Sequence, residues 1–229
     1  MREEGVSRTE TKFILDEVTA ARLRGAMGHV MLRDPNGGDD GYLVRSLYFD
    51  TPFDQDYHDK VDGLEARQKV RLRIYSSEDQ TAKLELKRKV GKYQWKNSFT
   101  VSRDDAYRLI DGQYAAVGEK ADSPFAKKLV AMMERNCYRP RTVVEFRRLA
   151  FIFHIENTRV TFDTKLRASQ SLPDLYSLNP AYHPILCPVI LEVKYANVLA
   201  GQIKIALAMA NQLPVSISKY CLGRQISFF

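Results

Sequence analysis

Alternation of charged and apolar side chains is clearest in the nine residues Arg67-Gln68-Lys69-Val70-Arg71-Leu72-Arg73-Ile74-Tyr75. Successive side chains of a strand point to opposite sides of a sheet, so this stretch predicts a strand with a cationic face and an aliphatic face. The aliphatic face must be covered. If helices cover it, the cationic face is turned inward or into a groove, where several like charges need anions between them. The stretch therefore indicates a site for a polyanion.

The same alternation recurs in four further segments, at residues 8–15, 83–90, 159–165 and 191–195. One such strand alone is most simply a half-buried antiparallel strand whose mixed charges face water. Five of them favour a closed β-barrel, because a barrel encloses a polar lumen and leaves no exposed sheet edge. We therefore expect an α+β fold, with a closed antiparallel barrel of eight strands around a basic lumen and helices outside. The water-facing sheet remains the alternative.

Length and composition set the bounds of the search. The chain has 229 residues, 45% of them hydrophobic, and we expect one domain over residues 1–229. The 35 Lys and Arg residues outnumber the 28 Asp and Glu residues, and the net charge of +7 favours an anionic partner: phosphates, nucleic acid or a membrane surface. Three cysteines without metal-ligand spacing indicate reduced thiols in the cytoplasm. We expect neither a secretory leader nor a membrane-spanning segment.

Local signals divide the chain into strands and helices without a linker. Asp16 and Ser123-Pro124 are helix-start signals, and Gly91-Lys92 predicts a hairpin turn. The expected strands are 8–15, 43–49, 66–75, 81–90, 93–101, 140–155 (with a bent pair as one option), 158–165 and 189–196. The expected helices are 16–28, 103–112, 123–137 and 198–210, and residues 34–41 and 168–188 are expected to be loops.

Several chemistries are excluded by missing motifs. The sequence has no Walker-type phosphate loop, no dinucleotide fingerprint, no Gly-x-Ser-x-Gly elbow and no histidines at metal-ligand spacing. Basic residues and a few carboxylates remain, which suits phosphoryl transfer by positioning and electrostatics around a divalent metal. Magnesium and manganese favour carboxylate oxygens. The candidate metal ligands are Glu10, Glu85, Asp163 and Glu192.

Eight short segments, in order along nearly the whole chain, carry a family resemblance. They are Arg8-Thr9-Glu10-Thr11-Lys12-Phe13, Ser46-Leu47-Tyr48-Phe49-Asp50-Thr51, Lys69 to Tyr75, Leu84-Glu85-Leu86-Lys87, Arg148-Leu149-Ala150-Phe151, Arg159 to Asp163, Leu191-Glu192-Val193-Lys194 and Ile217-Ser218-Lys219-Tyr220. Together they resemble the polyphosphate polymerase domain of the vacuolar transporter chaperone (VTC) family, a branch of the CYTH-like triphosphate tunnel metalloenzymes. The resemblance implies an eight-stranded tunnel that binds ATP with Mn²⁺ or Mg²⁺. It also implies transfer of the γ-phosphate onto a growing polyphosphate chain inside the tunnel.

The resemblance, taken together with the chemistry of the side chains, suggests roles for particular residues; of the carboxylates, the resemblance itself gives only Glu192 as a metal ligand. The catalytic positions are Arg71, Arg73, Lys87, Arg148, Arg159 and Lys219. The substrate-binding positions are Lys12, Lys69, Lys96, Lys194 and Ser218, and the metal-binding positions are Glu192, Glu10 and Glu85. Two positions depart from the pattern. Arg8 replaces the first glutamate of the superfamily's Glu-x-Glu-x-Lys motif, which argues against a plain hydrolase, and Ser216 stands where the family has a lysine.

Simpler roles and other functions stay open at this point. Glu192 could form a structural ion pair with Lys194, Trp95 could stack a base or pack within its strand, and Tyr48 is most simply a core residue. A triphosphatase would use water as the acceptor, and a non-catalytic sensor of polyphosphate or inositol phosphates would not need Glu192. We expect ATP and polyphosphate as ligands, no nucleic acid, and a cytoplasmic domain that could work at the inner face of a membrane through a partner protein.

Overall fold

The computed structural model describes residues 9–91, 93–171 and 175–226. Its strands are β1 (Thr9–Leu15), β2 (Leu32–Arg33), β3 (Tyr42–Asp50), β4 (Ala66–Ile74), β5 (Thr81–Val90), β6 (Tyr93–Ser102), β7 (Arg139–Phe153), β8 (Thr158–Ser169), β9 (His183–Pro184) and β10 (Val189–Tyr195). Its helices are α1 (Glu17–Val30), α2 (Gln55–Val61), α3 (Arg103–Ile110), α4 (Tyr114–Lys120), α5 (Pro124–Arg135), η1 (Ile155–Asn157), α6 (Gly201–Ala208) and α7 (Lys219–Gln225). The fold is therefore α+β, as predicted.

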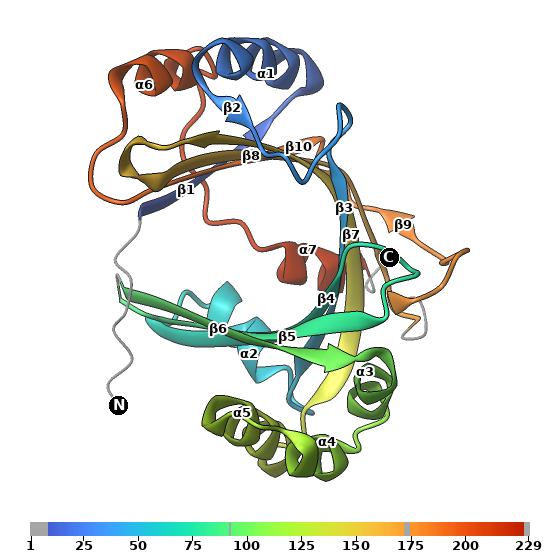
Figure 1. Cartoon of the computed structure of the whole chain (residues 1–229). Helices are drawn as coiled ribbons and strands as arrows, with labels where there is room; N and C mark the ends of the chain where they lie inside the picture. Colours follow the sequence, from blue (N-terminus) through green and yellow to red (C-terminus); the bar gives the residue numbers. More distant parts are fainter. Residues whose placement is uncertain (1–8, 92, 172–174, 227–229) are drawn as a thin grey trace.

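One large antiparallel sheet organises the molecule. Its strand order is β1-β10-β8-β7-β3-β4-β5-β6, with β2 beside β7 and β9 beside β8. Figure 1 shows the sheet curling so that β1, β8 and β10 face β4, β5 and β6 across a central space. The eight-strand path agrees with the sequence prediction, and the concave side is the inside of the curl.

Two layers of helices bury the convex side. Helices α1 and α6 cover the half of the sheet with β1, β8 and β10, where Leu23, Met27 and Ile203 are fully buried. Helices α3, α4 and α5 cover β4, β5 and β6, where Val70 and Leu72 are fully buried. The aliphatic face of the alternating stretch thus lies under helices, and its cationic face is left on the concave side.

The sheet does not close into the predicted barrel. Among the described residues, β1 pairs in the sheet only with β10, and β6 only with β5. The segment before α7 lies along the outer edge of β1, where the Val215 amide donates to the Lys12 carbonyl at 2.8 Å. Lys60 of α2 donates to the Ser216 hydroxyl at 2.6 Å from the other side. In the described residues, the outer edge of β1 therefore has a hydrogen bond to this segment and none to β6.

Helix α7 lies inside the curl, against the inner face of the sheet (Figure 1). Its Tyr220 packs with Tyr48 and Val144 in a third apolar cluster. Gly223 makes the approach possible, since a Cβ atom there would lie 2.7 Å from the Val144 Cγ2 atom. Ser218 caps the helix by accepting from the Cys221 amide. The cap residue and Lys219 beside it are thereby held in the central space.

The remaining differences from the sequence prediction are local. Residues 139–153 form one strand with a bulge between Glu145 and Arg147, not a bent pair. Helices α2, α4 and α7 and the short strands β2 and β9 were not predicted. The predicted caps are confirmed, because Asp16 accepts from the Thr19 amide and Ser123 from the Ala126 amide. In the described part of the chain, no helix combines the length and apolar character needed to span a membrane.

Candidate functional site

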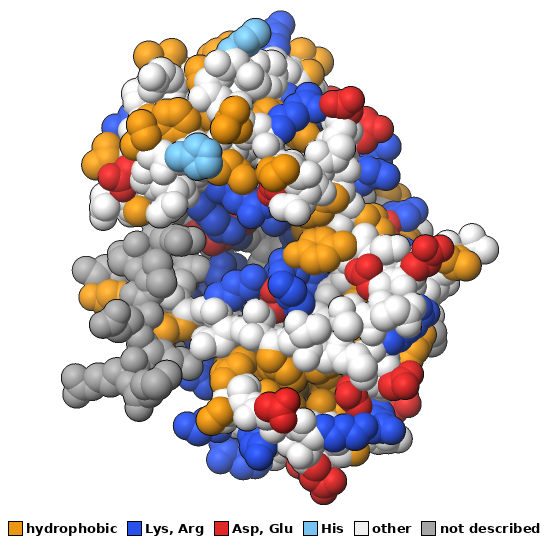
Figure 2. Space-filling model, viewed as in Figure 1, with side chains coloured by type: hydrophobic (Ala, Val, Ile, Leu, Met, Phe, Trp, Pro, Cys, Tyr) orange, Lys and Arg blue, Asp and Glu red, His pale blue; other side chains and the backbone are white. Residues whose placement is uncertain are grey.

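A cavity of about 590 Å³ fills the space inside the curled sheet. Figure 2 shows the hollow in the middle of this face, with Lys and Arg side chains gathered along it. Of the site residues expected from the sequence, all but the candidate metal ligand Asp163 line it, namely Glu10, Lys12, Lys69, Arg71, Arg73, Glu85, Lys87, Lys96, Arg148, Arg159, Glu192, Lys194, Ser218 and Lys219. Seven strands and α7 contribute to this set, so the fold brings distant segments to one place.

Glu85 is the anion at the centre of one wall. Its carboxylate lies 2.7 Å from Arg71 Nη2, 2.6 Å from Arg73 Nη2 and 2.9 Å from Lys96 Nζ. Burial alone raises the pKa of Glu85, but the three cations outweigh burial and hold the pKa at about 2. With three cations around its oxygens, Glu85 balances the positive charge of this wall, and its role as a metal ligand stays a prediction.

Asp163 anchors two cations from behind the wall. It is fully buried, and it receives Arg148 through two bonds of 2.7 Å and Lys219 Nζ at 2.6 Å. The aromatic ring of Phe146 lies 5.2 Å from the Arg148 guanidinium and 4.9 Å from Lys219 Nζ. Burial raises the pKa of Asp163, but Arg148 and Lys219 bring it below its ordinary value. Asp163 therefore fixes these cations, and the geometry does not present it as a metal ligand.

The opposite wall holds two carboxylates side by side. In the pairing of β1 with β10, Lys12 lies opposite Glu192, and Glu10 lies opposite Lys194. Lys12 Nζ is 2.9 Å from Glu10 and 3.5 Å from Glu192, and Lys194 is ion-paired to both. Burial and the neighbouring Glu192 raise the pKa of Glu10, but the lysines outweigh them and leave it at about 2.

Glu10 and Glu192 are the part of the site that suits a divalent cation. Their adjacent carboxylates are hard oxygen donors, and Mg²⁺ or Mn²⁺ commonly completes its shell with water and phosphate oxygens. No group of three or more acidic, histidine or cysteine side chains suited to a metal occurs in the described residues. The first-strand position held by Arg8 lies outside the described residues. A metal here would rest on two protein carboxylates.

Several cations of the cavity are incompletely neutralised. Burial, helped by the nearby positive charges of Lys12, Lys60 and Lys87, lowers the pKa of Lys69 to about 7. The Lys69 ammonium group donates to the Ser218 hydroxyl. Burial also lowers the pKa of Lys87, although Glu10 lies 3.1 Å away. A bound polyanion would supply the charge that these groups lack.

Six wall residues were not among the expected site residues, and Tyr48 and Phe146 are two of them. Tyr48, interpreted as core, lines the cavity and accepts from Arg71 Nη1 at 3.3 Å. Phe146 lies two residues before Arg148 on the same strand face, so the alternation could have identified it. Trp95, which had two open interpretations, is part of the cavity wall.

Arg159 lines this cavity, and Lys60 lines a small cavity that adjoins it. Arg159, at the rim, is held by Asp34 at 2.6 Å and by the Tyr42 hydroxyl at 2.9 Å. Ser216, where the family pattern has a lysine, receives the ammonium group of Lys60 at 2.6 Å. Helix α2 therefore brings a cation to the position where the sequence pattern lacks one.

Solved structures share the fold of this chain, and a family profile matches its sequence. A Bacillus halodurans protein described as a candidate adenylate cyclase superposes with a TM-score of 0.53 at 12% identity, covering 93% of this chain and 94% of that one. The PH1819 protein from Pyrococcus horikoshii gives a TM-score of 0.52 at 11% identity, covering 96% and 99%. No curated protein matches the sequence. A family profile for the VTC domain matches residues 7–228, and this chain therefore belongs to the VTC domain family.

Proposed function

We propose that this protein is a metal-dependent phosphotransferase that moves the γ-phosphate of ATP onto a growing polyphosphate chain. The observation that carries the proposal is the charge of the cavity, whose walls hold ten Lys or Arg residues against three glutamates. Membership of the VTC family supports chemistry on triphosphates, by phosphotransfer or hydrolysis. The choice of polyphosphate as the acceptor comes from the family resemblance of the sequence.

The reaction needs no nucleophile from the protein. A terminal oxygen of the bound polyphosphate attacks the γ-phosphorus of ATP, the bond from that phosphorus to the β-phosphate oxygen breaks, and ADP leaves. Arg71, Arg73 and Lys96 on one wall and Arg148 and Lys219 on another would bind the phosphate oxygens and stabilise the charge that builds up between the attacking and leaving oxygens. Because Glu85 and Asp163 already hold these cations in place, little reorganisation is needed when substrate binds.

A divalent cation on Glu10 and Glu192 would neutralise and orient phosphate oxygens in this scheme. Lys12 and Lys194 currently neutralise the same carboxylates, so the two lysines are free to turn toward phosphate when a metal takes their place. This arrangement predicts that triphosphate and metal bind with positive cooperativity.

The test is to incubate the purified protein with ATP and manganese and to separate ADP, free phosphate and polyphosphate. ADP together with chains supports the phosphotransferase. Free phosphate without chains would replace it with a triphosphatase. Tight polyphosphate binding without turnover would replace it with a sensor.

Two variants, one of them with a matched control, test whether the cavity is the site of the activity. Arg73→Gln should reduce both turnover and tripolyphosphate affinity, because it removes one of the cations on Glu85. Lys83→Gln is the matched control, since Lys83 lies opposite Arg73 on β5 but is exposed and outside the cavity wall. Glu192→Gln separates enzyme from sensor: an enzyme should lose turnover and keep tripolyphosphate affinity. Equal behaviour of Arg73→Gln and Lys83→Gln would reject the cavity as the site.

A further inference from the structure

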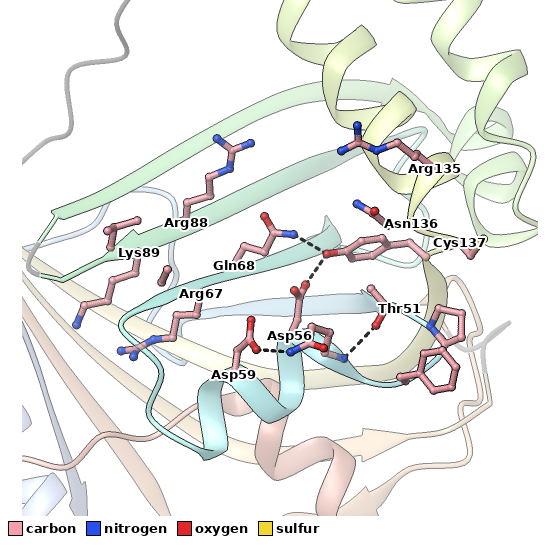
Figure 3. Close-up of a pocket in the computed structure, with 16 residues that line it drawn as sticks. Thr51, Asp56, Asp59, Arg67, Gln68, Arg88, Lys89, Arg135, Asn136 and Cys137 are labelled. Carbon is pink, nitrogen blue, oxygen red and sulfur yellow. Dashed lines mark hydrogen bonds between the residues drawn. The ribbon is translucent and has the colours of Figure 1, made fainter.

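A second cavity, of about 670 Å³, lies at the start of β4 and the end of β5, beside α2 and the end of α5 (Figure 3). Gln68 on β4 pairs with Arg88 on β5, and both alternate with lumen residues such as Lys69. Their side chains therefore belong to the convex face of the sheet, away from the cavity inside the curl, which is the proposed site of catalysis and is called the catalytic cavity below. We call this cavity the outer pocket.

The rim of the outer pocket is strongly basic. Arg67, Arg88, Lys89 and Arg135 all line it. Among the residues that the structure describes, none of these four has a carboxylate oxygen within 4 Å of its charged group. The cations of the catalytic cavity are different, because most of them are ion-paired to Glu10, Glu85, Asp163 or Glu192. Four uncompensated cations around one concavity create a positive potential that attracts anions.

The floor of the outer pocket is polar and ordered. Gln68 donates to the Tyr138 hydroxyl at 2.7 Å, and that hydroxyl donates to Asp56 Oδ2 at 2.9 Å. Figure 3 shows Gln68 and Asp56 between the arginines Arg88 and Arg135 on one side and Arg67 on the other. Asp56 is 2% exposed, and burial raises its pKa to about 8. Near pH 7 its carboxyl group is therefore mainly protonated and adds little negative charge.

The other acid of the outer pocket is Asp59. Its Oδ1 atom accepts from the Gln55 side chain at 2.6 Å, so it has a neutral partner of its own on α2. One carboxylate against four cations leaves the pocket with a positive charge. The pocket is therefore suited to an anion with several charges.

The outer pocket is connected to the catalytic cavity by shared wall residues. Arg67, Gln68, Arg88 and Lys89 also line a small cavity of about 150 Å³. That small cavity in turn shares Glu10, Lys12, Lys69, Lys87 and Gln94 with the catalytic cavity. Arg67 and Lys89 pair with each other at the strand ends, where the concave face passes into the convex face. Basic side chains thus follow one path from the catalytic cavity around the sheet edge.

We propose that the outer pocket is a second anion site, which holds the distal part of a condensed-phosphate chain whose reacting end lies in the catalytic cavity. The identity of the chain rests on the proposed function. Because the two places lie on opposite faces of the sheet, we expect a triphosphate to occupy one of them, whereas a long chain can bridge both and gain affinity from the second contact. The outer pocket would therefore favour long chains over short ones and keep a growing chain bound between transfers.

The test compares tripolyphosphate with long-chain polyphosphate as ligands in calorimetric titrations of the full chain. The variant Arg88→Gln/Arg135→Gln removes two exposed cations of the pocket. We expect it to weaken long-chain binding about fivefold or more, the loss that two exposed charge contacts supply, and to leave tripolyphosphate binding within about twofold. The matched control is Lys127→Gln/Lys128→Gln, which removes the same charge from exposed positions of α5 outside the pocket. The control should bind both ligands like the wild type.

Two results would overturn the second site. One is unchanged long-chain affinity in the pocket variant, and the other is an equal loss in the pocket and control variants, which would show general charge attraction only. The outcome is separable from the fate of the proposed function. A selective loss of long-chain binding in a protein that makes no polyphosphate from ATP would keep the second site and reject the phosphotransferase. Polyphosphate synthesis from ATP, without a selective loss of long-chain binding in the pocket variant, would keep the phosphotransferase and reject the second site.

Discussion

Replacing Glu85 by glutamine tests the charge balance of the catalytic cavity directly. Glutamine keeps the shape of the side chain and removes its negative charge, while Arg71, Arg73 and Lys96 remain around it. Glu85 is 2% exposed, so water cannot replace the lost compensation. We expect the variant to be less stable than the wild type and to bind tripolyphosphate more tightly, because the three cations then lack their carboxylate.

The size of the effect follows from the pKa. A fall from 4.5 to about 2 corresponds to about 3 kcal/mol of preference for the charged form in the folded protein. Removing one partner of a buried ion pair costs roughly 3–5 kcal/mol, which agrees. Because the folded pKa is lowered, this contribution is complete above about pH 4.5 and is lost as the pH falls toward 2. The variant should therefore show a smaller loss of stability on acidification.

The assay is urea unfolding at pH 7 and pH 3, followed by the fluorescence of Trp95, the one tryptophan of the sequence and a neighbour of Lys96 on β6. Lys83→Gln serves as the control for a change of one charge unit on the same strand as Glu85. A difference below about 1 kcal/mol between Glu85→Gln and wild type at pH 7 would refute the argument. It would mean that the three cations are solvated independently of Glu85.

Three further predictions concern pH and packing. Tripolyphosphate affinity should fall as the pH rises above 7, because Lys69 loses its proton there. Calorimetry in buffers of different ionisation enthalpy should show that the protein takes up a proton when tripolyphosphate binds. The variant Lys69→Met should abolish this uptake. The folded protein raises the pKa of Asp56 to about 8, so the stability that protonated Asp56 contributes is lost as the pH rises from about 4 through 8. Asp56→Asn should therefore show a flatter pH dependence of stability than the wild type. Urea unfolding at pH 6 and pH 9 measures this difference. Gly223→Ala should destabilise the protein by about 1–3 kcal/mol by pushing against Val144, whereas Gly25→Ala on α1, where a Cβ meets nothing within 4 Å, should not; equal midpoints for the two variants would contradict the close packing of α7.

The lumen residues could be predicted because strand periodicity is local. The phase of Lys69, Arg71 and Arg73 follows from their spacing, and the covering of Val70 and Leu72 follows from their hydrophobicity. The helix starts at Asp16 and Ser123 could also be predicted from the sequence, because a cap is a contact between residues three positions apart. These features need no knowledge of what the rest of the chain does.

The ion pairs of the site could not be predicted in the same way. Glu85 and Asp163 were both candidate metal ligands by residue type, and only the fold shows that cations from β4, β6, β7 and α7 surround them. Helix α2 was not predicted because it is only seven residues long and the side chain of its N-cap residue, Asp54, makes no cap bond. The outer pocket joins α2, α5 and two strands, and no spacing in the sequence relates these elements.

The sequence by itself determined the strand phases, the basic face and the family, because strand alternation and each short motif depend only on residues that are close together in the sequence. Only the tertiary structure decided that the sheet stays open, that α7 lies inside it, and which carboxylates neutralise which cations. These outcomes depend on contacts such as the 2.8 Å bond from Val215 to Lys12, between segments about two hundred positions apart. Periodicity assigns a side chain to a face, but the edge that a strand bonds is settled by competition among all the segments that can reach it.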